Sequence, residues 1–199
     1  MCIRDRIKII NTHDFGVKYC QNLRQAGRWI ADVNNYLLDN CTYNNCLYIM
    51  ADEMYHENSH EEIYNFAHQE QNNALSFKFL HFIFNLKTIR KPTETYTHAV
   101  RMMKRDDFAS YHDGYNFKAI KGVISKTRYS ENYIFHLGHI MDFRKKMDIY
   151  TQKGEIFQHA NANYLDNFSK VAYEGNFPKY LNNPRMYSCL LYTSPSPRD

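Results

Sequence analysis

The stretch that decides the fold is Cys46-Leu47-Tyr48-Ile49-Met50-Ala51-Asp52-Glu53, a short apolar run that ends in two adjacent acids. Its length and its apolar character predict a buried β-strand over Cys46–Met50. Ser59, with Glu62 three residues later, predicts a capped helix that continues to about Glu70. A buried strand, an acidic turn and a helix in succession are typical of an α/β protein.

The rest of the chain extends this pattern. Strict alternation of polar and apolar residues over Leu75–Phe79, continuing to Phe84, predicts a strand with one face more polar than the other. The other expected strands are Ile7–Ile10, Ala99–Lys104 and Tyr133–His136, and the expected helices are Leu23–Leu38 and a charged segment from about Met141 onward. We therefore expect an α/β fold with a largely parallel central sheet, in which ligands bind at the carboxyl ends of the strands.

Composition excludes several classes of protein. The formal net charge of +4 is mild, and the short basic run Arg144-Lys145-Lys146 is expected to be a solvated helix face, which argues against a nucleic-acid binder. No apolar run approaches the roughly 20 residues of a membrane span, so we expect no transmembrane segment. The cysteines show no paired CxxC spacing, which favours a reducing compartment and a cytoplasmic location.

Both ends of the chain resemble translated sequencing adapters of the transposon type. Residues 1–6 read MCIRDR and residues 189–199 read CLLYTSPSPRD. Such segments should be excluded from reasoning about the fold. We expect native sequence from about Ile7 to Ser188, as part of one catalytic domain within a longer chain.

The two acids after the first buried strand are candidate metal ligands. Asp52 and Glu53 fall where a parallel sheet opens its binding crevice. Adjacent carboxylates suit a hard divalent cation such as manganese or magnesium, which would hold a diphosphate. The alternative is an acid that only favours the entry of the following helix, through the positive end of its dipole.

A family resemblance favours the metal. Tyr48-Ile49-Met50-Ala51-Asp52-Glu53-Met54-Tyr55-His56-Glu57 resembles the YLQADEvxHE signature of family 2-like glycosyltransferases of bacteria and phages. Further segments resemble motifs of the same family in the same order: Gly27–Leu38, Leu75–Phe82, Val100–Met103, Ser110–Phe117 and Ile134–Gly138. The resemblance covers most of residues 7–160.

The resemblance implies a GT-A-like three-layer sandwich with a mostly parallel central sheet. It also implies a nucleotide-sugar donor, a carbohydrate or other hydroxyl acceptor, a divalent cation (manganese or magnesium), and inversion at the anomeric carbon. In this fold the N-terminal strand that binds the nucleotide base would precede Ile7, and we expect it to be missing from this sequence.

The resemblance also implies roles for individual residues. Asp52 would bind the metal together with His136, and Asp113 would be the general base that deprotonates the acceptor. The residues implied for the donor and its diphosphate are Asp52, Glu53, Asn35 and Arg101. The chain departs from the family at Met50, which removes a plain Asp-x-Asp motif, and at His139, where the family has an aromatic residue.

Three other interpretations compete with this one. His56-Glu57-Asn58-Ser59-His60 matches the zinc-protease motif HExxH, whose two histidines must share one face of a continuous helix. A helix capped at Ser59 leaves His56 outside it, so we set this motif aside. A catalytically silent carbohydrate-binding module and a metal-dependent hydrolase that uses Asp52, Glu53 and His136 stay open. His81, among phenylalanines, is expected to be buried and hydrogen-bonded.

Overall fold

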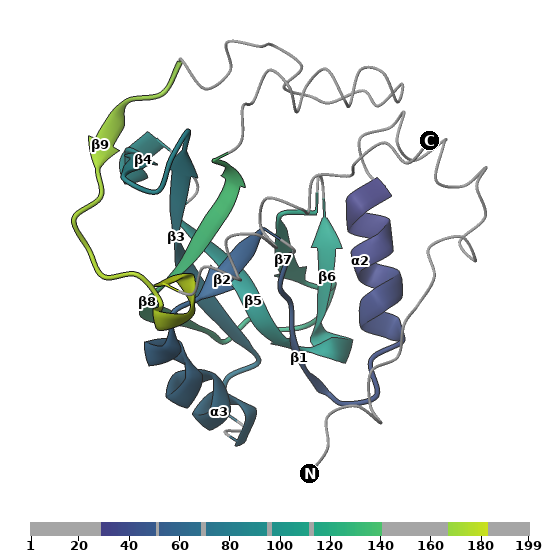
Figure 1. The fold of residues 1–199 in the computed structure, drawn as a ribbon. Helices are drawn as coiled ribbons and strands as arrows, with labels where there is room; N and C mark the ends of the chain where they lie inside the picture. The colour runs from purple at the N-terminus through teal and green to yellow at the C-terminus, as the bar shows by residue number, and fades with distance from the viewer. Residues whose placement is uncertain are drawn as a thin grey trace, which may run out of the picture.

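The structure, a computed structural model, describes residues 29–50, 52–68, 71–94, 97–111, 114–140 and 167–182 (Figure 1). The helices are α2 (Trp29–Asp39) and α3 (His60–His68), and the strands are β1 (Asn45–Leu47), β2 (Glu53–Tyr55), β3 (Ala74–Ile83), β4 (Thr88–Arg90), β5 (His98–Lys104), β6 (Phe108–Tyr111), β7 (Asn116–Ala119), β8 (Thr127–His139) and β9 (Lys170–Ala172). Short 3-10 helices are η3 (Glu57–Ser59), η4 (Pro92–Glu94), η5 (Arg105–Asp107) and η7 (Lys179–Asn182). The predicted strand Ile7–Ile10, the adapter-like ends and residues 141–166 of the helical segment predicted from Met141 onward lie outside the described residues. Over residues 167–182, the continuation of that segment, the structure has the strand β9 and the 3-10 helix η7.

Strand β3 is the centre of a seven-stranded sheet in the described part of the chain. One edge of β3 pairs in parallel with β8, and β8 pairs antiparallel with β2. The antiparallel partners of β3 are β5, which continues to β1, and β4, which continues to β9. Strands β6 and β7 form a separate antiparallel hairpin.

This topology corrects the prediction of a largely parallel sheet. Among the described strands, β3 and β8 form the one parallel pair, and all other pairings are antiparallel. A parallel pair needs a long crossover, whereas strands joined by short connections pair antiparallel. The strand-helix-strand-helix order of the sequence predicts parallel pairing, but β2 and β3, the strands on either side of α3, do not pair with each other.

Three of the predicted strands are confirmed, with one difference in burial. The predicted strands over 75–84, 99–104 and 133–136 correspond to β3, β5 and part of β8. Strand β3 does not have the expected solvent-exposed polar face, because Ser76 is buried and Lys78 is half-buried. The alternation of polar and apolar residues predicts one exposed face, but both faces of β3 are covered.

The predicted strand Cys46–Met50 is shorter and less buried than expected. Strand β1 has only the residues Asn45–Leu47 and pairs with β5 alone among the described strands. Leu47 and Ile49 are exposed, at 45% and 53%. The apolar run therefore lies at the edge of the sheet and then leaves it, which brings Asp52 back to the opposite side beside β8.

Helix α3 begins where predicted, but its cap differs. The 3-10 helix η3 precedes it, and the His56 side chain caps η3 by accepting a hydrogen bond from the Asn58 backbone. Glu62 does not close a capping box with Ser59. Its carboxylate instead accepts from Asn132 Nδ2 at 2.9 Å, on strand β8. The hydrogen bond from Asn132 on β8 therefore takes the place of the predicted capping contact between Glu62 and Ser59.

The core lies on both faces of the sheet because neighbouring residues of β3 point to opposite sides. Leu75 packs towards α3, in a cluster with Tyr55, Phe66, Phe77, Phe79, Ala99, Met102 and Ile134. Ala74 packs towards α2 and the β6–β7 hairpin, in a cluster with Leu38, Cys46, Val100, Met103, Phe108 and Phe117. The α/β class is therefore confirmed, with a helix on each side of the sheet (Figure 1). None of the described helices is long and apolar enough to cross a membrane.

We predict that Phe66→Ala lowers the free energy of unfolding by about 3 to 5 kcal/mol, because it leaves a cavity in the core under α3. Phe66 is fully buried, whereas Tyr64 in the same helix is 65% exposed. Tyr64→Ala is the matched control and should change the free energy of unfolding by less than about 1 kcal/mol. Urea denaturation measures both, and equal losses would contradict this packing of α3.

Candidate functional site

A β-bulge places Arg101 in the interior. Leu75 of β3 pairs with Met102 of β5, and the next residue Ser76 pairs with Val100, so Arg101 is the extra residue on β5. A bulge of this kind bends the strand and re-aims a side chain. Arg101 is fully buried, which is rare for arginine and requires hydrogen-bond partners for its N–H groups.

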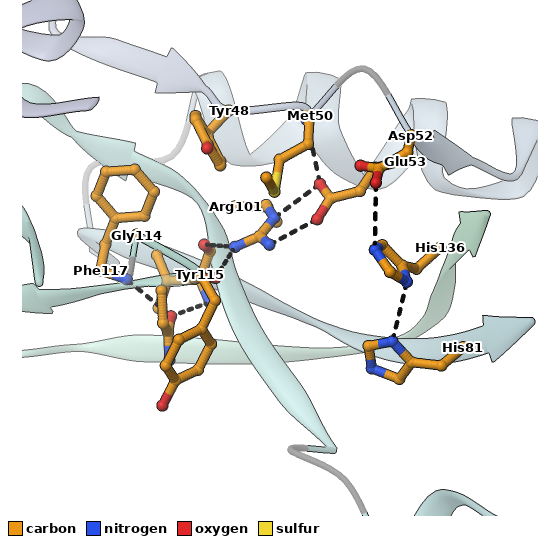
Figure 2. Close-up of polar contacts among 12 residues, drawn as sticks. Tyr48, Met50, Asp52, Glu53, His81, Arg101, Gly114, Tyr115, Phe117 and His136 are labelled. Atoms are coloured by element: carbon orange, nitrogen blue, oxygen red, sulfur yellow. Dashed lines mark hydrogen bonds and ion pairs between the residues drawn. The ribbon is translucent and has the colours of Figure 1, made fainter. Parts of the chain in front are cut away.

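The main partner of Arg101 is Glu53, the first residue of β2. Arg101 Nε donates to Glu53 Oε2 at 3.0 Å, and an Nη atom donates to Oε1 at 2.7 Å (Figure 2). Glu53 Oε2 also accepts from the Met50 backbone at 3.3 Å. The side chains of the pair are 0% and 1% exposed. This bidentate geometry, with two parallel hydrogen bonds, is the strongest form of an Arg–carboxylate contact.

Arg101 also connects this pair to the segment after β6. Its second Nη donates to the Tyr115 carbonyl at 2.7 Å and to the Val100 carbonyl at 3.1 Å. The guanidinium carbon lies 4.9 Å from the ring centre of Phe79 and 5.2 Å from that of Tyr48. Glu53 and Arg101, both predicted to contact the donor, therefore contact each other and tie three segments together.

Asp52, the neighbour of Glu53, faces a different partner. Its Oδ2 lies 3.5 Å from Nε2 of His136, and its carbonyl accepts from the Leu137 backbone at 2.8 Å. The side chain of Asp52 is 37% exposed and that of His136 is 13% exposed. The two residues predicted to bind a metal are thus brought together, with the carboxylate on the solvent side.

Gly138 makes this approach possible. A Cβ atom at Gly138 would lie 2.9 Å from Nε2 of His136 and would collide with Oδ2 of Asp52. Any side chain at this position would therefore separate the carboxylate from the imidazole. The sequence shows a glycine two residues after His136. Only the structure shows that Asp52 Oδ2 and His136 Nε2 occupy the space that a side chain at Gly138 would fill.

His81 joins the other side of His136. The Nδ1 atoms of the two rings lie 3.1 Å apart, and His81 is 6% exposed (Figure 2). The prediction that His81 is buried and hydrogen-bonded is confirmed. Burial lowers the pKa of His81 well below the ordinary range for histidine, so the ring is neutral near pH 7. Its place beside His136 was missed because strand register is not visible in a single sequence.

Asn35 acts on the backbone of β6. Its Nδ2 donates to the Ser110 carbonyl at 3.1 Å, and its Oδ1 accepts from the Ser110 backbone at 2.6 Å. The adjacent Asn34, which sequence reasoning missed, donates to the Gly114 carbonyl at 3.0 Å and accepts from the Tyr48 hydroxyl at 3.1 Å. Helix α2 thus holds β6 and the residues after it. The predicted general base, Asp113, lies outside the described residues.

The position of His56 also bears on the zinc-protease motif. His56 precedes η3 and caps it, while His60 is the first residue of α3. The two imidazoles are therefore not on one face of a continuous helix, as that chemistry needs. The sequence-based exclusion holds, although the cap is His56 and not Ser59.

The distance between Asp52 and His136 fits a shared cation. Two ligands at about 2.1 Å from one ion lie roughly 3.0 to 3.4 Å apart in octahedral or tetrahedral geometry. The observed 3.5 Å is within a small adjustment of this range. No group of three or more His, Cys, Asp or Glu side chains in the described residues is arranged to hold a metal ion. A cation here would need ligands beyond Asp52 and His136, from a substrate, from water or from residues outside the described ranges.

In this site His136 contacts Asp52 through Nε2 and His81 through Nδ1. Glu53 and Arg101 lie beside it in the interior of the protein. Comparison of the chain with models of protein families, with curated proteins and with solved structures finds no match. What the chain does is therefore best inferred from the chemistry of these residues. Carboxylate oxygen and imidazole nitrogen are both ligands for manganese, and oxygen for magnesium.

We predict that the buried pair stabilises the fold only as a pair. Arg101→Met alone leaves a buried carboxylate without its counter-charge and should lower the free energy of unfolding by about 3 to 5 kcal/mol. Glu53→Leu alone should cost a similar amount. The double variant removes both charges and should recover most of the loss, as measured by urea denaturation. A double variant that loses the sum of the two single effects would show that the two residues do not depend on each other.

Proposed function

We propose that this chain is the catalytic core of a metal-dependent glycosyltransferase with a GT-A-like fold. It transfers a sugar from a nucleotide-diphosphate-sugar to a hydroxyl acceptor, with inversion at the anomeric carbon. The observation that carries the proposal is the pair Asp52 and His136. The family resemblance assigns both residues to the metal, and their side chains lie 3.5 Å apart although they come from distant parts of the chain.

In this proposal Asp52 and His136 hold a divalent cation, manganese or magnesium. When bound, the cation neutralises charge on the departing nucleotide diphosphate. The partly exposed Asp52 carboxylate supports this role, because a diphosphate can approach it from solvent. The remaining positions around such a cation would be left for oxygens of the diphosphate and for water.

The other predicted donor-binding residues act as supports. Arg101 is fully buried and its charge is matched by Glu53, so it positions the Met50–Glu53 turn and does not reach the donor. Asn35 holds the backbone of Ser110. Asp113 is proposed as the general base that takes the proton from the acceptor hydroxyl, on the side of the sugar opposite the leaving group.

We predict that Asp52→Ala weakens Mn²⁺ binding, and Mn²⁺-dependent binding of UDP-sugars, by at least about 100-fold, because it removes a direct ligand. Isothermal titration calorimetry of the full chain, with UDP-glucose and UDP-galactose as probes, measures both. The matched control is Asp106→Ala, since Asp106 is 69% exposed and pairs with Arg105 on the surface. It should bind like the unaltered protein.

The same titrations, together with assays of released sugar and nucleotide, separate the competing functions. A carbohydrate-binding module predicts that Asp52→Ala leaves ligand affinity nearly unchanged, which would contradict the transferase. A metal-dependent hydrolase predicts that free sugar, or a cleaved phosphoester, is released at the same rate with and without an added acceptor. Release of nucleotide that depends on an acceptor, and on Mn²⁺, supports the transferase.

A further inference from the structure

A bulge in strand β8 brings two tyrosines together on one face of the sheet. Tyr129 lies opposite Ser76 of β3, and Tyr133 lies opposite Lys78, so a step of four residues on β8 matches a step of two on β3. Ser76 and Lys78 point to the same face and are about 7 Å apart along the strand. The two tyrosines are therefore neighbours on that face, and they are 65% and 39% exposed.

Helix α3 fixes this bulge from the other side of the sheet. The carboxylate of Glu62 accepts hydrogen bonds from the Ser130 hydroxyl and from Asn132 Nδ2, and the Asn132 backbone donates to Ser130 Oγ at 3.0 Å. Ser130 is fully buried. A bulge re-aims the side chains of its strand. The position of the tyrosines is thus set by buried hydrogen bonds within the fold.

Polar groups of both signs surround the two rings. The Tyr129 ring meets the His98 ring nearly at a right angle, with ring centres 5.5 Å apart, and Lys78 Nζ lies 5.7 Å from the ring centre of Tyr133. Lys78 is paired with Glu131 of the bulge, whose side chain is 89% exposed. We call these five residues the tyrosine patch. Its lysine and glutamate compensate each other, so the patch offers hydrogen-bond donors and acceptors without a net charge.

This composition selects among possible ligands. A nucleic acid needs positive charge that is not already paired, and Lys78 is paired with Glu131. A protein partner needs about 20 to 30 residues on each side, which is far more than the patch contains. An uncharged sugar fits, because its C–H groups carry slight positive charge and are attracted to the negative face of an aromatic ring. Its hydroxyls can pair with donors and acceptors alike.

We propose that the tyrosine patch binds an uncharged oligosaccharide, whose sugar rings stack on Tyr129 and Tyr133. Tyr133 and His136 are three positions apart on β8 with no register shift between them, so the patch is on the face of the sheet opposite to His136. Binding at the patch therefore needs neither Asp52 nor a cation, and it does not rest on the proposed function. In a transferase the patch would anchor a carbohydrate acceptor outside the metal site.

Isothermal titration calorimetry of the full chain without Mn²⁺ tests this proposal, with maltohexaose, cellohexaose, laminarihexaose and chitohexaose as probes. At least one of these sugars should bind. Tyr129→Ala and Tyr133→Ala should each lower its affinity by at least about fivefold, because each removes a stacking ring. Tyr129→Phe keeps the ring and should stay within about threefold of the unaltered protein. The matched control is Tyr64→Ala, which removes an equally exposed tyrosine from α3 and should leave the affinity unchanged.

The contradicting results are distinct. Binding of none of the four sugars with a dissociation constant below about 10 mM would overturn the proposal, as would equal affinity in the unaltered protein and both alanine variants. Affinity that falls steeply between about 50 and 200 mM salt would indicate a charged ligand and would also overturn it. Urea denaturation shows that the variants remain folded.

Asp52→Ala separates this proposal from the proposed function. The variant should bind the sugar like the unaltered protein, because Asp52 is not part of the tyrosine patch. If Asp52→Ala loses the sugar while Tyr129→Ala keeps it, the sugar binds at the metal site and the tyrosine patch is overturned. If the unaltered protein binds the sugar at the patch but binds no Mn²⁺, the patch stands and the proposed function fails.

Discussion

The carboxylate of Glu53 and the guanidinium of Arg101 meet in the interior, where neither charge could persist without the other. The bidentate contact joins the start of β2 to the bulge in β5. The other Nη atom of Arg101 donates to the carbonyls of Val100 and Tyr115. Because Glu53 is held inside, its neighbour Asp52 is left at the turn before β2, opposite His136. The candidate site therefore depends on an ion pair that is not itself exposed to a substrate.

The two adjacent acids thus have different tasks, although their chemistry is the same. Glu53 has a full positive charge beside it and stabilises the arrangement of strands. Asp52 is partly exposed and lies beside the imidazole of His136, so in the proposed function its carboxylate is the one that binds the cation. Gly138 and His81 complete this division, since Gly138 gives Asp52 and His136 room and His81 contacts the far side of His136.

Local features of the chain could be predicted from the sequence, and long-range pairings could not. Alternation and apolar runs located β3 and β5, because a period of two is a property of neighbouring residues. The partner of Arg101 depends on a bulge, and that of His81 on the register of two distant strands. The antiparallel pairings were missed for the same reason. Asp52 and His136 were paired in advance only through the family resemblance, and Asp113 stays a prediction.

The most direct test of the proposed site is to detect the nitrogen of His136 on the bound metal. Pulsed electron paramagnetic resonance of Mn²⁺ bound to the full chain reports directly coordinated imidazole nitrogen. The proposed site predicts a nitrogen signal that disappears in His136→Ala and persists in His98→Ala, a histidine on β5 that contacts Tyr129 at the surface. A signal that is absent from the unaltered protein, or unchanged in His136→Ala, would contradict the assignment of Asp52 and His136 to a cation.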